Sequence, residues 1–173
     1  FAFVSGAGSN VRKRTPATAL NSVQAFLSAT QEGRSVSSKK KNRQPPKRPS
    51  RKYLRVLYAE DNIVNQKVLG RVLTKLGITD LDIVDDGLKA VEISATKEYD
   101  IIFMDMQMPI MDGLEATRLI KESCGDGVTI AAPKIIFCTA HAMDDFRLQA
   151  EQAGGDGFVS KPFNMETIDS ILQ

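Results

Sequence analysis

Residues 101–113 read Ile-Ile-Phe-Met-Asp-Met-Gln-Met-Pro-Ile-Met-Asp-Gly. The first four form a short, unbroken apolar run, which is the pattern of a strand buried on both faces. This run ends at an acidic residue, Asp105, and apolar residues return at helical spacing from Leu114 onward. The stretch therefore predicts a buried strand that ends in a carboxylate, followed by a loop and a helix.

The same order of strand and helix is repeated five times between residues 53 and 173. The expected strands cover residues 54–59, 81–84, 101–104, 134–138 and 157–160. The expected helices cover about residues 64–76, 87–95, 114–120, 142–153 and 165–172. Alternating strands and helices form parallel sheets with helices on both faces. We therefore predict an α/β fold with a doubly wound, five-stranded parallel sheet. We expect the flavodoxin-like order 2-1-3-4-5, which is one of the common orders of such sheets and makes strands one and three neighbours.

The first of these helices has a wide apolar stripe. Gly77 follows it and is expected to end it in a left-handed conformation. The apolar residues that share one helical face are Val64, Val68, Leu69, Val72, Leu73 and Leu76.

Charge divides the chain into two regions. Residues 1–52 carry twelve Lys and Arg against one acid, a net charge of +11, whereas residues 53–173 carry eleven against twenty, a net charge of −9. Residues 35–52 contain one aliphatic side chain among Ser, Lys, Arg, Asn, Gln and Pro, which is typical of disorder. We predict a basic, mostly disordered linker over 1–52, with the pattern of a short helix at about 16–29, and a folded acidic domain over 53–173.

The basic clusters at 39–41 and 47–48 also fit a nuclear-import signal or a contact with nucleic acid. No aromatic residues lie between these charges, so a solvated tether is favoured and nucleic acid is not the expected partner.

Several protein classes are disfavoured by composition. The two cysteines lack the spacing of a disulfide framework or a metal site, which indicates a reducing, cytoplasmic setting. No apolar run reaches the roughly 20 residues of a membrane-spanning helix, and no signal peptide opens the chain. The chain begins with Phe, which suggests a piece of a longer protein.

Polar residues follow four of the five expected strands: Glu60 and Asp61, then Asp105, Thr139 and Lys161. In such sheets ligands bind beyond the carboxyl ends of the strands, where the strand order reverses. Three carboxylates in one cleft repel one another, and Mg²⁺ with its preference for oxygen ligands would relieve the repulsion. A carboxylate beside Mg²⁺ can accept a phosphoryl group, for which a lysine and a hydroxyl are suitable partners.

Each of these residues also has a purely structural interpretation. Asp61 or Asn62 could cap the following helix, because both residue types are favoured there. Thr139 could be an ordinary strand-end residue and Lys161 a solvated surface lysine. Their joint occurrence at the strand ends favours the phosphoryl site.

Four segments within residues 53–173 resemble the receiver domain of two-component signalling. They are the acidic segment at 60–68, the segment around Asp105 at 105–113, Thr139-Ala-His-Ala at 139–142 and Lys161-Pro-Phe at 161–163. The version at 60–68 is most like the C-terminal receiver of a hybrid sensor histidine kinase.

This resemblance implies a role for each matching residue. Asp105 is expected to be the phosphoacceptor, and Lys161 its counter-charge. Glu60, Asp61 and Asp105 are expected to bind Mg²⁺ together with the backbone carbonyl of Gln107. The peptide bond between Lys161 and Pro162 is expected to be cis.

The resemblance also implies a switch and partners. Thr139 is expected to move toward the phosphoryl group, and Phe158 to turn inward into the vacated space. The expected partners are a histidine kinase domain, in cis within a hybrid kinase parent, and a histidine phosphotransfer protein or domain. The chain itself is then a phosphoacceptor module and not an enzyme that turns over substrate.

Two other functions stay open from the sequence. An Mg²⁺-dependent phosphohydrolase with an aspartate nucleophile would usually carry a second acid two residues after it, where this chain has Gln107. A nucleic-acid-binding regulator could act through the basic segment, although no binding fold follows it.

Overall fold

The computed structural model describes residues 53–124, 132–140 and 144–173. The linker, short helix and import signal expected within residues 1–52 lie outside these described residues. From Tyr53 onward, the chain alternates between strands and helices as the hydrophobic pattern predicts.

The five strands form one parallel sheet in the order β2-β1-β3-β4-β5. This order confirms the predicted flavodoxin-like topology. The strands are β1 (Arg55–Ala59), β2 (Asp80–Val84), β3 (Ile101–Asp105), β4 (Lys134–Thr139) and β5 (Gly157–Ser160). The central strand β3 is buried along its whole length, as its unbroken apolar run requires.

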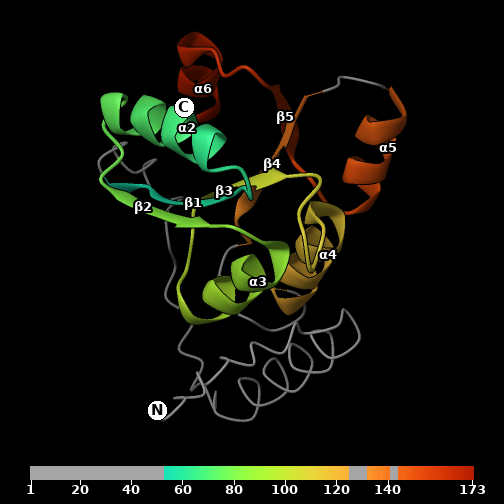
Figure 1. Ribbon diagram of the computed structural model, residues 1–173. Helices are drawn as coiled ribbons and strands as arrows, with labels where there is room; N and C mark the ends of the chain where they lie inside the picture. The colour runs from blue at the N-terminus through green and yellow to red at the C-terminus, as the bar shows by residue number, and fades with distance from the viewer. Residues whose placement is uncertain (1–52, 125–131, 141–143) are drawn as a thin grey trace, which may run out of the picture.

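Helices cover both faces of the sheet (Figure 1). Two of them, α2 (Ile63–Lys75) and α6 (Met165–Ile171), lie on one face. The other face is covered by α3 (Gly87–Thr96), α4 (Gly113–Ser123) and α5 (Asp144–Gln152). Among the described helices, none combines the length and apolar character needed to cross a bilayer.

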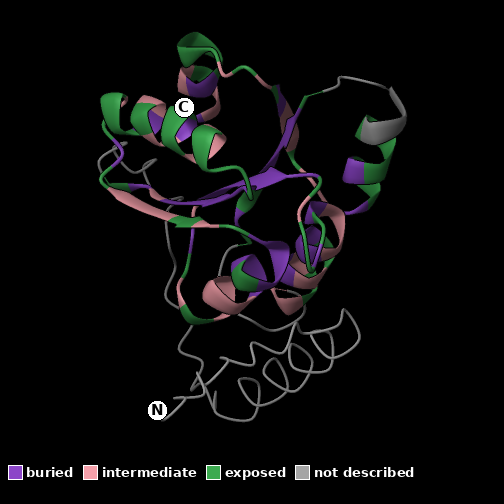
Figure 2. Cartoon of the chain, viewed as in Figure 1, coloured by how far each residue is buried: buried purple, intermediate pink, exposed green. Residues whose placement is uncertain are grey.

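Alternate residues of each strand supply the two cores between the sheet and its helices. Tyr58, Phe103 and Cys138 belong to the core beneath α2 and α6. Their chain neighbours, such as Ala59 and Met104, belong to the core beneath α3, α4 and α5. Figure 2 shows the buried residues following the sheet and the inner faces of the helices. The alternation follows from the period of two along a strand, and it decides which side chains share a face at the strand ends.

Short polar side chains begin most of the helices. Asn62 accepts hydrogen bonds from the backbone N–H of Val64 and Asn65 at the start of α2, and Asp112 accepts one from Glu115 at the start of α4. Because Asn62 is the cap of α2, Asp61 is not needed for that role.

The apolar stripe of α2 is only partly buried. Leu69 and Leu73 are buried in the core, whereas Val64 and Val68 are 63% and 43% exposed. Gly77, with φ of 92°, ends this helical segment in the left-handed conformation that was predicted.

Candidate functional site

Strand register brings four of the predicted polar positions to one edge of the sheet. Ala59 pairs with Met104, so Glu60 follows β1 beside Asp105 at the end of β3. Thr139 ends β4 and pairs with Ser160, and its backbone carbonyl accepts a hydrogen bond of 2.8 Å from the backbone N–H of Lys161. The structure therefore brings these four predicted positions together at the carboxyl ends of the strands.

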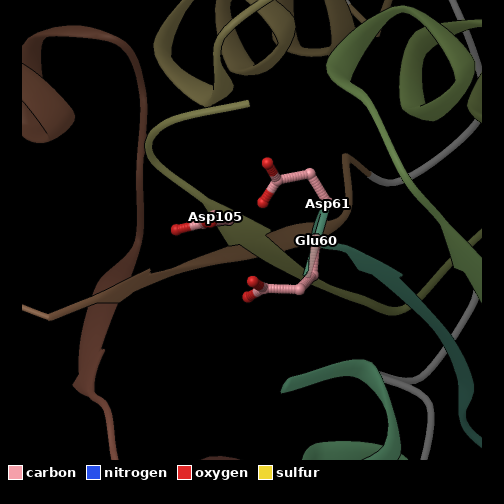
Figure 3. Close-up of side chains that lie close together, drawn as sticks. All are labelled: Glu60, Asp61 and Asp105. Atoms are coloured by element: carbon pink, nitrogen blue, oxygen red, sulfur yellow. The ribbon is translucent and has the colours of Figure 1, made fainter. Parts of the chain in front are cut away.

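Three carboxylates gather at this edge. Ligand oxygens of Glu60, Asp61 and Asp105 all lie within 4.8 Å of one another. In Figure 3 the three side chains project from the ends of β1 and β3 into the same space. Glu60 is 1% exposed and Asp105 9% exposed, whereas Asp61 is exposed to solvent. The cluster is thus open on one side, where a ligand can enter.

The ammonium group of Lys161 bridges two of these carboxylates. Its Nζ lies 2.6 Å from Oε2 of Glu60 and 3.0 Å from Oδ1 of Asp105. Burial alone would lower the pKa of Lys161, but the hydrogen bonds to Glu60 and Asp105 outweigh it and raise the pKa above its ordinary value. Lys161 therefore carries its positive charge throughout the physiological pH range. The peptide bond that follows, Lys161–Pro162, is cis, as expected.

Asp105 occupies an unfavourable position for a negative charge. Burial raises the pKa of its carboxyl group, the hydrogen bond from Lys161 opposes this, and the nearby charge of Glu60 raises the pKa further. The backbone N–H of Met106 also donates to Oδ1 of Asp105 at 2.9 Å. The net effect is a raised pKa, which marks Asp105 as a perturbed group within the carboxylate cluster.

Three polar residues around Glu60 were not singled out in the sequence. Tyr58 donates its hydroxyl hydrogen to Oε2 of Glu60 at 2.9 Å, and Asn65 donates from its amide to Oε1 at 2.7 Å. The amide of Gln66 donates to the backbone carbonyl of Glu60 at 2.6 Å. The period of two along β1 places Tyr58 and Glu60 on one face, and this was the available signal.

The two predicted switch residues belong to the opposite face of the sheet. Thr139 is buried and directly follows Cys138 in β4, so the two side chains point to opposite faces of the sheet. Phe158 is half-buried and stacks on Phe137 with ring centroids 6.1 Å apart, while the guanidinium of Arg147 lies 5.7 Å from its ring centre. Thr139 and Phe158 thus lie on the same face of the sheet as Phe137.

Gln107 lies two residues after Asp105 in the loop that follows β3, and it is exposed to solvent. The role of its backbone carbonyl as a metal ligand stays a prediction.

The donor set fits a hard divalent cation. Three carboxylates and one ammonium group leave the cluster with two uncompensated negative charges, all on oxygen atoms. Oxygen ligands of this kind suit Mg²⁺, which is usually held by one or two carboxylates together with water and phosphate.

The raised pKa of Asp105 predicts that its charge destabilises the metal-free fold. A folded-state pKa above the unfolded value means that stability falls as the pH rises through the folded pKa. Asp105→Asn should therefore increase the free energy of unfolding at neutral pH, because the amide carries no charge that burial disfavours. Urea denaturation in the presence of EDTA would measure it. The difference from the wild type should disappear below the unfolded-state pKa of aspartate, and a constant difference at all pH values would contradict the prediction.

Fold and site together define an open α/β sheet protein with an acidic, lysine-bridged cluster at the carboxyl ends of its strands. The amino-acid sequence matches the response regulator receiver domain family over residues 56–173. The chain therefore belongs to the response regulator receiver domain family of two-component phosphorelay signalling.

Similar proteins include hybrid histidine kinases. The chain is 37% identical over 123 residues to hybrid signal transduction histidine kinase K of Dictyostelium discoideum, covering 69% of this chain and 10% of that protein. It is 36% identical over 124 residues to the osmosensing histidine protein kinase SLN1 of Saccharomyces cerevisiae, covering 69% of this chain and 10% of the kinase. The chain thus spans about a tenth of the length of these curated relatives.

Solved structures of receiver domains share the fold. One is the receiver domain of sensor histidine kinase PA1611 from Pseudomonas aeruginosa, with a magnesium ion coordinated in its active-site cleft. It has a TM-score of 0.61 and 35% identity, over 69% of this chain and 94% of that one. Another is the receiver domain of Saccharomyces cerevisiae Ssk1, in a co-crystal with the histidine phosphotransfer protein Ypd1. It has a TM-score of 0.63 and 28% identity, over 69% of this chain and 86% of that one.

Proposed function

We propose that Asp105 accepts a phosphoryl group from a phosphohistidine, in a reaction that depends on Mg²⁺, and that the phosphorylated chain then presents a changed surface to a partner. The observation that carries this proposal is the arrangement around Asp105. Its buried carboxylate is held by Lys161 within 4.8 Å of two further carboxylates, at the open edge of the sheet.

The chemistry uses one oxygen of Asp105 as the nucleophile. Within the described part of the chain, both hydrogen bonds to this carboxylate end on Oδ1, from Met106 and Lys161. Oδ2 is therefore the oxygen that we expect to attack. A bond forms between Oδ2 and phosphorus while the bond from phosphorus to the donor imidazole nitrogen breaks, and the imidazole keeps the electron pair.

Three side chains and one carbonyl would hold the metal: Glu60, Asp61, Asp105 and the backbone of Gln107. Mg²⁺, when bound, supplies positive charge opposite the oxygens of the transferred phosphoryl group. The magnesium ion in the cleft of the PA1611 receiver supports this assignment. Lys161 already lies between Glu60 and Asp105, and its charge is available to a phosphoryl oxygen on Asp105.

The response to phosphorylation would use Thr139 and Phe158. The Thr139 hydroxyl moves toward the new phosphoryl oxygens, and Phe158 turns into the space that it leaves. This is a two-state change biased by a local charge. The half-buried position of Phe158 on Phe137 supports it, because the ring already packs against a core residue on one side.

The partners follow from the relatives. The hybrid kinases support a histidine kinase domain as the donor, within a parent protein of the same kind. The Ypd1–Ssk1 complex supports a histidine phosphotransfer protein as a second partner.

The expected result of phosphorylation is the addition of one phosphoryl group per chain. The full chain would be incubated with a small acyl-phosphate donor, with Mg²⁺ or with EDTA, and its intact mass measured. We expect labelling with Mg²⁺ and at least a tenfold lower rate with EDTA, because the carboxylate cluster then lacks its neutralising charge. The concentration of acyl phosphate that remains would be measured in parallel. Continuous hydrolysis of the donor without labelled chain would contradict the proposal and favour the phosphohydrolase.

A further inference from the structure

The hydroxyl group of Tyr58 lies inside the core, at the base of the acidic cluster. Tyr58 is fully buried in β1, two residues before Glu60, so both side chains project from the same face. Its ring meets that of Phe163 edge to face, with centroids 6.2 Å apart and an interplanar angle of 85°. The ring is therefore held firmly, and its hydroxyl points at Glu60 Oε2 from a distance of 2.9 Å.

Glu60 is almost completely buried, so its carboxylate depends on protein hydrogen bonds. Oε1 accepts from Asn65 at 2.7 Å, whereas Oε2 accepts from Tyr58 and lies 2.6 Å from Nζ of Lys161. A buried carboxylate that loses a donor is strongly disfavoured, because water does not replace the lost hydrogen bond.

The two donors to Oε2 differ in what else they do. Lys161 also contacts Asp105, and it is the residue whose charge a phosphoryl group on Asp105 would attract. If Lys161 moved toward that group, Tyr58 would be the donor left on Oε2. Tyr58 is attached to the core of the sheet and not to the reacting centre, so it can hold Glu60 in both situations.

We propose that Tyr58 is a positioning residue for the metal site. Its hydroxyl holds the Glu60 carboxylate in the orientation that binds Mg²⁺ and allows Lys161 to leave Glu60 for the phosphoryl group. This inference rests on the proposed function, since it concerns the same Mg²⁺ site. Without the hydroxyl, Lys161 is the one donor on Oε2 among the described residues, and Glu60 is drawn toward it and away from the metal.

The test is the Mg²⁺ dissociation constant of the full chain, measured by calorimetric titration. Tyr58→Phe removes one oxygen atom and should raise this constant roughly tenfold, which corresponds to about 1.4 kcal/mol. Glu60→Asp keeps a carboxylate but shortens the side chain by one methylene group, which takes it out of reach of Tyr58. In the Glu60→Asp background, Tyr58→Phe should therefore cause no further change. An unchanged or tighter constant for Tyr58→Phe, or an equal rise in both backgrounds, would overturn the inference.

Tyr99→Phe provides a matched control. Tyr99 is also buried, and its hydroxyl donates to a carboxylate, Asp82 in the middle of β2, at 2.6 Å. Both tyrosine variants should lose comparable stability in urea denaturation, but Tyr99→Phe should leave Mg²⁺ binding unchanged. The control separates a role at the site from a general loss of packing or hydrogen bonding.

A second measurement does not depend on the folding of Tyr58→Phe. The chain has three tyrosines and no tryptophan, so its near-ultraviolet absorbance reports on tyrosine environments. Saturating Mg²⁺ should change this spectrum in the wild type and in Tyr99→Phe, and the absence of a change would contradict the inference.

If the wild type binds no Mg²⁺, the proposed function and the inference both fail. If it binds and Tyr58→Phe binds equally well, the inference alone fails.

Discussion

Asp105→Asn should abolish phosphorylation of the chain by a small acyl phosphate in the presence of Mg²⁺. The wild type should gain the mass of one phosphoryl group, and the variant none. The reason is chemical: an amide at this position has no carboxylate oxygen to attack phosphorus and no negative charge for the metal. Loss of rate by at least a thousandfold is expected, because the nucleophile itself is removed.

A carboxylate in the same loop serves as its control. Asp112 is exposed and caps α4 by accepting a hydrogen bond from the backbone N–H of Glu115 at 2.8 Å. Asn is an equally good cap, so Asp112→Asn should keep both the fold and the labelling. Labelling of Asp105→Asn, or its loss in Asp112→Asn, would contradict the assignment of Asp105 as the acceptor.

Gly113→Ala should cause a large loss of stability, because the added methyl group would overlap backbone atoms. A Cβ atom on Gly113 would lie 2.0 Å from the backbone oxygen of Asp105 and 3.0 Å from Cγ of Met104. The N–H of Gly113 also donates to the carbonyl of Met106 at 3.1 Å, so the start of α4 is tied to the end of β3. Backbone atoms cannot give way as a flexible side chain can. We expect a loss of about 3 kcal/mol in urea denaturation.

The same substitution should also impair phosphorylation under conditions in which the variant is still folded. Any shift of the Asp105 backbone changes the direction of its carboxylate relative to Lys161 and Glu60. Gly70→Ala is the matched control, because its Cβ would meet Ile83 at an ordinary distance of 3.5 Å within helix α2. That variant should gain about 0.5–1 kcal/mol, since Ala favours a helix more than Gly does. Equal stability of Gly113→Ala and the wild type would contradict the close contact between Gly113 and the backbone of Asp105.

Much of the fold could be predicted from local patterns. The apolar run that ends at Asp105 became β3, and Gly77 adopted the left-handed conformation expected at the end of a helix. Alternating strands and helices predicted a parallel, doubly wound sheet, and the flavodoxin-like strand order places Glu60 beside Asp105 in the observed register. These features depend on residues near one another in the sequence or on rules shared by all parallel sheets.

Other features needed the folded chain. Asp61 and Asn62 were equivalent candidates for the cap of α2, and hydrogen-bond geometry decided for Asn62. The exposure of Val64 and Val68 could not be predicted from helical periodicity, because periodicity gives a shared face but not the extent of the sheet beneath it.

By itself, the sequence determined the class of fold, the strand ends at which polar residues gather and the family to which the chain belongs. Only the tertiary structure decided that Tyr58 donates to Glu60, that Lys161 bridges Glu60 and Asp105, and that Gly113 touches the backbone of Asp105. The physical reason is one of range. Hydrophobic periodicity is a local property, whereas a hydrogen bond or a steric contact depends on distances of a few ångströms between segments far apart in the chain, which packing alone decides.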